Sequence, residues 1–217
     1  MSLLLNQISQ NVDELDIKEI LDNAPTYSTG ISAVYETLWE REIIEKNLTE
    51  EKDFLGKIAR LRNGFDEELS MLLASHSEQV ITHFLKIWQR FFLKENGGWL
   101  PFHNSIRQFL IEKTSMDRFG SYRENHHIEY NSSIAEALQS LPIENSMRWE
   151  LAFHLCESRQ YDELLKLISV DSVIAYARQF RLIEDIQEEI LLGFRACKRV
   201  RGTLEDLDNC SCLILRK

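Results

Sequence analysis

Glycine and proline are scarce in this sequence, with 8 and 3 copies among 217 residues. Both residues form the many turns that β-sandwiches and β-barrels need, so their scarcity argues against those architectures. It also excludes collagen-like and proline-rich low-complexity chains. Hydrophobic residues nevertheless make up 44% of the chain, which is enough for a sizeable core. The composition therefore predicts a globular, mainly helical protein.

Cysteine is also rare, and long apolar runs are missing. The four cysteines, Cys156, Cys197, Cys210 and Cys212, include no Cys-x-x-Cys pair, which argues against a disulfide-linked secreted fold. The apolar start at residues 1–5 lacks the basic region and cleavage site of a signal peptide. No run approaches the ~20 apolar residues of a membrane-spanning helix. We therefore expect a soluble, cytoplasmic protein without a membrane partner.

Positive charge is in the minority. The chain has 25 Lys and Arg residues against 35 Asp and Glu residues, which gives a formal net charge of −10. An acidic chain repels the phosphate backbone of DNA and RNA, and this repulsion argues against nucleic acid as a partner.

Apolar residues recur at spacings of three and four along most of the chain, which predicts amphipathic helices. The predicted helices span residues 1–24, 31–44, 49–61, 65–74, 78–90, 104–113, 122–141, 149–158, 161–168, 172–180 and 183–198. Thr49 and Asp66 are the predicted N-caps of two of these helices, and Asn63-Gly64 is the predicted end of the helix that starts at Thr49.

Two short apolar runs, 91–93 and 99–102, flank Asn96-Gly97-Gly98, and this pattern predicts a β-hairpin. The order helix, short helix, longer helix, hairpin is that of a winged helix. The later helices resemble the paired helices of TPR-like repeats. The predicted fold class is all-α with a minor β-hairpin. Its regions are a helical segment over 1–29, a winged-helix domain over 30–118, a helical-repeat-like domain over 119–202 and a loose tail over 203–217.

A longer motif follows the predicted hairpin. Residues 103–110 read His-Asn-Ser-Ile-Arg-Gln-Phe-Leu. This stretch resembles the His-x-Ser-φ-Arg-x-Phe-Leu signature (φ apolar) of the winged-helix domain of STAND NTPases, the NACHT and NB-ARC class of signalling ATPases. Other segments resemble parts of that class in the same order, and the resemblance covers roughly residues 15–170. Residues 17–39 resemble the lid end and entry helix, and residues 54–60 resemble the first helix of the winged helix. Residues 130–138 and 149–156 resemble the helical superstructure.

The resemblance implies a role for His103. In that class the winged-helix histidine contacts the ADP phosphates, so His103 is a candidate nucleotide-phosphate sensor, and a histidine can donate a hydrogen bond to phosphate. The alternative is a histidine that forms a hydrogen bond at a helix start. Asn104 and Arg107 either position this region or are solvated. Ser105 is interpreted as a helix cap, because no His/Asp partner is evident that would make it a nucleophile.

The chain departs from that class in one respect. It contains no Gly-x-x-x-x-Gly-Lys-[Ser/Thr] sequence, and Gly97-Gly98 is followed by Trp99. A P-loop needs such glycines and the lysine to hold phosphates. The resemblance therefore implies a non-enzymatic regulatory and scaffold segment. ADP or ATP would be a cofactor only in a longer parent protein, whose NTPase domain, or other proteins, would be the partners.

Two other functions are compatible with the sequence. The first is a free-standing adaptor that binds proteins through a winged-helix and helical surface. The second is a winged-helix DNA-binding regulator, whose reader helix would be 78–90. That helix carries only two cations, Lys86 and Arg90, among many large apolar residues, which argues against base reading.

Three smaller patterns have a functional and a structural interpretation. His126-His127 could bind a metal, but adjacent helical residues diverge, so a solvated helix face is favoured. Cys210-x-Cys212 could hold Zn²⁺ or Cu⁺ with outside ligands, and a loose tail is favoured. The basic cluster 198–201 either complements a helix C-terminus or faces an acidic partner.

Overall fold

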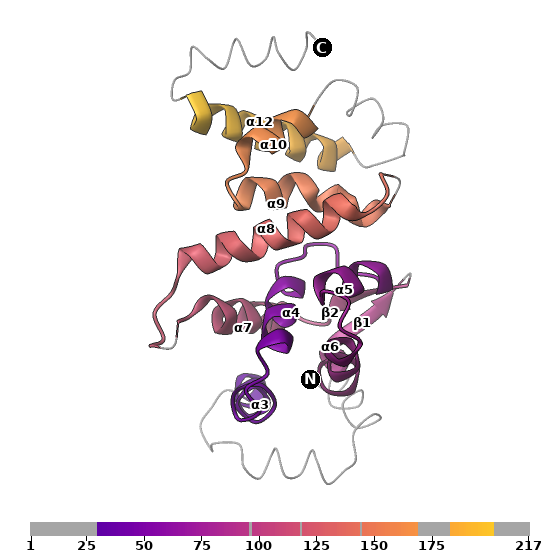
Figure 1. The fold of residues 1–217 in the computed structure, drawn as a ribbon, viewed down its shortest axis with the longest axis vertical. Coiled ribbons are helices and arrows are strands. Elements are labelled where there is room, and N and C mark those ends of the chain that lie inside the picture. Colours follow the sequence, from indigo (N-terminus) through magenta and orange to yellow (C-terminus); the bar gives the residue numbers. More distant parts are fainter. Residues whose placement is uncertain (1–29, 96, 118, 144, 169–182, 202–217) are drawn as a thin grey trace. The chain divides into compact units, whose positions relative to one another are not determined.

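The computed structural model describes residues 30–95, 97–117, 119–143, 145–168 and 183–201 (Figure 1). The chain divides into two compact units, Met1–Arg123 and Glu124–Lys217. The described residues are mostly helical, with one two-stranded antiparallel hairpin, which confirms the predicted fold class at this level. The predictions for 1–29, 172–180 and 203–217 lie outside the described residues, as do those for Cys210 and Cys212.

The described part of the first unit begins with the helix predicted over 31–44. Helix α3 (Gly30–Trp39) continues into a π-helical turn, η1 (Glu40–Ile44). Its buried apolar residues are Tyr35, Leu38, Trp39 and Ile43. They recur at the spacing of one helix face, which is why the sequence pattern located this helix.

Helix α4 (Thr49–Ile58) differs from the prediction at both ends. Thr49 is its first residue and not its N-cap, since Leu48 holds the N-cap position without a side-chain hydrogen bond. The acidic first turn, with Glu50 and Glu51, supplies the favourable interaction with the helix dipole instead. Gly64 lies beyond the helix end. Gly64 has a φ of +87° and lies against Trp99. A Cβ atom added at Gly64 would be only 2.4 Å from the Trp99 carbonyl oxygen.

The next helices follow the predicted order. Asp66 is the N-cap of α5 (Glu67–Leu73), and its carboxylate accepts a hydrogen bond from the Leu69 backbone N–H at 2.8 Å, as predicted. The helix predicted over 78–90 consists of three segments: α6 (Glu78–His83), the π-helical η2 (Phe84–Trp88) and the 3₁₀-helical η3 (Gln89–Phe91). Large side chains spaced by four, at Val80, Phe84 and Trp88, are all buried. Residues spaced by four lie on one face of a helix, so this series faces the core.

The hairpin pairs β1 (Phe92–Glu95) with β2 (Gly98–Pro101), so that Phe92 lies opposite Pro101. Phe65 forms an isolated bridge with Trp99 and ties the hairpin to the start of α5. The core of this unit is aromatic, with edge-to-face contacts among Trp39, Phe54, Phe65, Phe84, Trp88, Phe92 and Phe109.

Helix α7 (Asn104–Ser115) follows the hairpin, two residues longer than predicted. The loop after it belongs to the first unit. Met116 and Tyr122 form a β-bridge, and the Arg123 backbone N–H donates to the Ser115 carbonyl. Residues 119–123, assigned by the sequence to the second domain, therefore fold back onto the end of α7.

The second unit contains α8 (Glu124–Ser140), η4 (Ser146–Glu150), α9 (Leu151–Glu157), α10 (Tyr161–Leu167) and α12 (Ile183–Arg201). Helix α9 packs against α8 and α10, and α10 packs against α12 (Figure 1). Helices α9 and α10 are joined by a tight turn in which Arg159 has a φ of +61°. No helix among the described residues of the chain is long and apolar enough to cross a membrane.

Candidate functional site

His103 occupies the N-cap of α7, directly after the hairpin. Its backbone is extended, and its Nδ1 atom accepts a hydrogen bond from the Ser105 backbone N–H at 3.1 Å. The predicted helix-start hydrogen bond of His103 is therefore present. The interpretation of Ser105 as the cap is wrong, because Ser105 is the donor at the second helical position. An N-cap side chain satisfies such an otherwise unpaired N–H.

A series of hydroxyl groups supports the His103 ring. Its Nδ1 atom is 2.9 Å from Ser105 Oγ, which is 3.2 Å from the Tyr35 hydroxyl. Burial raises the pKa of Tyr35, while the hydrogen bond with Ser105 lowers it less, so the phenol remains neutral near pH 7. This arrangement leaves Nδ1 as an acceptor, and a neutral ring then carries its proton on Nε2.

The Nε2 atom of His103 is available to an outside acceptor. The residue is exposed, and Nε2 has no partner among the residues that the structure describes. It lies at the N-terminus of a helix whose first turn contains no acidic side chain. Helix N-termini favour anions through their unpaired N–H groups and the helix dipole. The geometry thus combines one N–H donor of an exposed imidazole with an anion-favouring helix end.

Two arginines hold α7 in place. Arg107 Nε donates to the Ala59 carbonyl oxygen at 3.0 Å, so Arg107 positions the helix and is not simply solvated. Near the other end, the buried Arg60 donates to Thr114 Oγ1 at 3.0 Å and to Ser115 Oγ at 2.7 Å. Asn104 is exposed. Both ends of α7 are thereby fixed to the C-terminal end of α4, which fixes the place of the His103 ring.

His127 of α8 differs from the favoured prediction of a solvated helix face. His127 Nε2 is 3.2 Å from Glu157 Oε2 and 3.1 Å from Asn131 Nδ2, so this side chain contacts two helices and is not simply solvated. Among the described residues, no group of three or more His, Cys, Asp and Glu side chains could hold a metal ion.

The structure also reveals a hollow in the second unit that sequence reasoning missed. It has a volume of about 580 Å³ and lies among α8, α9, α10 and α12. In the sequence, the basic cluster at 198–201 was one indication of this hollow. Arg195 precedes Lys198 and Arg199 by three and four residues, a spacing that places all three on one helix face. Arg159, which lies in the turn after α9, gave no signal because its position depends on the packing of the helices.

The chain matches no family model, no curated protein and no solved structure. The interpretation of the His103 site therefore rests on its geometry and on the motif over 103–110.

Proposed function

We propose that this chain is the non-catalytic regulatory segment of a STAND-type signalling ATPase that acts in the cytoplasm. In this proposal the first unit is a winged helix that senses the nucleotide state. The second unit is a TPR-like helical scaffold that binds protein. The order of α4, α5, the helical stretch 78–91 and the hairpin supports the winged-helix assignment, because it is the order of helices and hairpin in such a domain.

The observation that carries the proposal is the hydrogen bonding of His103. Its Nδ1 atom caps α7, and its exposed Nε2 atom is the ring position that remains to donate. A diphosphate oxygen at that position would accept from Nε2–H while the α7 dipole favours its negative charge. Ser105 and Tyr35 would hold the ring in the donating tautomer.

Catalysis falls outside the proposed role. The sequence contains no P-loop motif, so phosphate cradling and hydrolysis would come from an NTPase domain in the same native polypeptide. We therefore expect this purified chain not to hydrolyse ATP. ATP turnover by the chain that is lost on His103→Ala would contradict this expectation.

The first test is the mass of the native polypeptide from its source cells, with peptides mapped along it. A longer polypeptide with an upstream P-loop peptide would support the proposal. A native mass near 25.5 kDa would overturn it and favour a free-standing protein-binding adaptor.

The second test examines His103 in that longer polypeptide. His103→Asn keeps a good N-cap side chain but removes Nε2–H. We expect it to release ADP about tenfold faster, the effect of one lost charge-assisted hydrogen bond. His76→Asn is the matched control, because His76 is an exposed histidine of the same unit at a φ of +62°, which Asn tolerates. Equal ADP release from wild type and His103→Asn would contradict the sensor role.

DNA binding has less support in the structure. Six residues of the stretch 78–91 are exposed: Glu78, Gln79, Thr82, Leu85, Lys86 and Gln89. They carry one acid and one base, so they offer no positive surface for phosphates. A fluorescence titration with duplex DNA at low salt tests this alternative, since tight and salt-sensitive binding would favour a DNA-binding regulator.

A further inference from the structure

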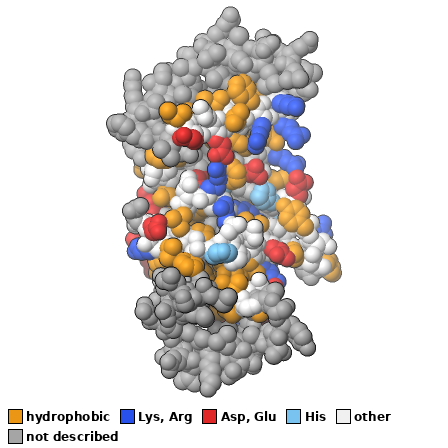
Figure 2. Space-filling view, turned by 180° about the vertical axis from the view of Figure 1, so that it is seen from behind, with side chains coloured by type: hydrophobic (Ala, Val, Ile, Leu, Met, Phe, Trp, Pro, Cys, Tyr) orange, Lys and Arg blue, Asp and Glu red, His pale blue; other side chains and the backbone are white. Residues whose placement is uncertain are grey.

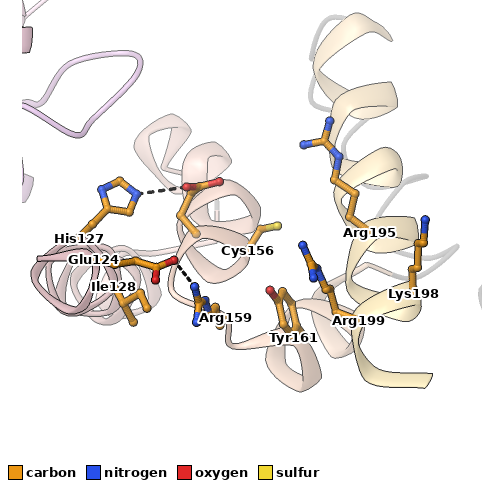
Figure 3. Close-up of a pocket in the computed structure, with 10 residues that line it drawn as sticks. Glu124, His127, Ile128, Cys156, Arg159, Tyr161, Arg195, Lys198 and Arg199 are labelled. Atoms are coloured by element: carbon orange, nitrogen blue, oxygen red, sulfur yellow. Dashed lines mark hydrogen bonds and ion pairs between the residues drawn. The ribbon is translucent and has the colours of Figure 1, made fainter. Parts of the chain in front are cut away.

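The hollow of the second unit has cations on one wall and paired charges on the other. Arg195, Lys198 and Arg199 line it from α12, whereas Glu124 and His127 line it from α8 (Figure 3). The other lining residues are Ile128, Cys156, Glu157, Arg159 and Tyr161. We call this hollow the α12 pocket. Its volume of about 580 Å³ lies within the usual range of small-ligand sites.

Both carboxylates of the α12 pocket already have partners. Glu124 forms an ion pair with Arg159, and Glu157 Oε2 is 3.2 Å from His127 Nε2. The hydrogen bond from His127 is the main cause that lowers the pKa of Glu157, although burial acts to raise it. Each acid therefore has a hydrogen-bonded or ion-paired basic partner outside α12, and Glu157 also interacts electrostatically with Arg195.

The three cations of α12 lack such partners. The side chains of Arg195, Lys198 and Arg199 form no hydrogen bond or ion pair with the described residues of the chain, and all three are exposed. Figure 2 shows Lys and Arg side chains gathered over this end of α12. Three like charges on one helix face repel one another.

The helix dipole accounts for only part of this cluster. Cations stabilise the last turn of a helix, and Lys198 and Arg199 are near the end of α12. Arg195 precedes the last turn, where the dipole effect has fallen off. It is close enough to Cys156 and Glu157 to lower the pKa of both side chains, although burial keeps the pKa of the Cys156 thiol raised. The thiol is thus held neutral, and the pocket is suited to binding rather than to nucleophilic chemistry.

We propose that the α12 pocket binds a small phosphate ester, whose phosphate lies against Arg195, Lys198 and Arg199. Arginine forks match phosphate oxygens in pairs, and the lysine adds a compact charge. A doubly charged anion would remove the repulsion among the three cations. This inference is independent of the role proposed for His103, because every residue that it uses belongs to the second unit.

A small ligand fits the pocket better than an acidic protein segment does. The cations line one hollow of limited volume rather than an extended surface. Glu124 and Glu157 on the facing wall would repel an extended chain of carboxylates, whereas a compact phosphate contacts only the α12 wall. The half-buried Tyr161 ring offers a surface for the organic part of the ester.

The test is a calorimetric titration of the full chain with pyrophosphate at low ionic strength. We expect saturable binding at one site. The triple variant Arg195→Gln/Lys198→Gln/Arg199→Gln should weaken it at least about tenfold, because it removes the charge-assisted hydrogen bonds. The matched control, Lys52→Gln/Lys86→Gln/Lys166→Gln, removes the same charge outside the pocket and should leave the affinity within about twofold.

A gain-of-affinity variant separates binding from folding. Glu124→Gln removes the partner of Arg159 and adds a fourth available cation to the pocket. We expect it to bind pyrophosphate several-fold more tightly than wild type, a result that misfolding cannot produce.

Three outcomes would overturn the proposal. The first is no saturable pyrophosphate binding by the wild-type chain. The second is equal weakening in both triple variants, which would show an effect of net charge alone. The third is binding of a hexaglutamate peptide, but not of pyrophosphate, that the pocket variant abolishes; this result would assign the α12 pocket to an acidic protein partner.

Discussion

His154 Nδ1 lies 2.8 Å from Asn131 Oδ1, and both side chains are fully buried. Asn131 Nδ2 donates to the His127 carbonyl oxygen at 2.8 Å, which orients Oδ1 toward the His154 ring. The other ring nitrogen, Nε2, is 3.2 Å from Glu150 Oε2. Both nitrogens of the ring therefore face acceptors. This polar network links α8, η4 and α9 inside the second unit, where water cannot replace a lost partner.

We expect His154→Leu to lower the free energy of unfolding by about 2–4 kcal/mol, because Asn131 and Glu150 lose a donor in a buried site. His126→Leu is the matched control. His126 is half-buried on α8 and should change stability by less than about 0.5 kcal/mol. Urea unfolding followed by circular dichroism measures both variants. Equal losses would show that the buried network contributes nothing beyond packing.

Glu42 should make the stability of the first unit depend on pH. Burial acts to raise its pKa, but hydrogen bonds from Lys46 and Arg41 outweigh burial, so the pKa is lowered from its ordinary value of 4.5. The resulting stability is present above pH 4.5 and is lost as pH falls through the lower, folded-state pKa. We expect Glu42→Gln to cost about 1–3 kcal/mol at pH 7. That difference from wild type should shrink below pH 4.5.

Urea unfolding across pH 3–7 measures this dependence. Glu40→Gln is the control, because Glu40 is exposed on the same π-helical turn. It should follow the wild-type curve. A cost for Glu42→Gln that is constant over the whole range would contradict the assignment.

Substituting Gly64 and Gly97 by alanine distinguishes the cost of backbone strain from the cost of a steric clash. Both have a positive φ, +87° and +85°, but an added Cβ would meet the Trp99 carbonyl oxygen only at Gly64, and nothing lies within 4 Å at Gly97. We expect Gly97→Ala to cost about 1 kcal/mol from strain alone. Gly64→Ala should cost at least about 2 kcal/mol more, because β2 must move. Thermal unfolding of both variants tests this, and equal shifts in Tm would contradict it.

Two N-caps in the first unit differ in a testable way. Asp66 accepts a hydrogen bond from the Leu69 N–H, whereas Ser77 caps α6 without a side-chain hydrogen bond. We expect Asp66→Ala to cost about 1 kcal/mol and Ser77→Ala only a few tenths. Chemical denaturation compares them directly. A larger loss for Ser77→Ala would mean that the hydrogen bond at Asp66 does not stabilise α5.

Much of the fold was predictable because its signals are local. Asp66 precedes two acids and an apolar run, a pattern that specifies a helix start within one turn. The hairpin was predictable from glycines between two apolar runs. Thr49 was misassigned because an N-cap depends on backbone geometry as well as on residue type, and the backbone places Leu48 there.

The candidate sites were predictable only in part. The sequence identified His103 and offered a helix-start hydrogen bond for it, but not the support from Tyr35, which lies far away in the sequence. The basic cluster identified Lys198 and Arg199, but not that Arg159 lines the same pocket. The residues that share a pocket depend on how separate helices pack, and no sequence pattern within one helix encodes this packing.

Residue order alone establishes the helical class, the hairpin, most helix positions and the acidic character of the chain, since each depends on neighbours within a few turns. Packing establishes the rest. The tautomer of His103, the contact of Gly64 with Trp99 and the facing walls of the α12 pocket all join segments distant in the chain. Their energies arise from excluded water and matched hydrogen-bond geometry, which exist only once those segments meet.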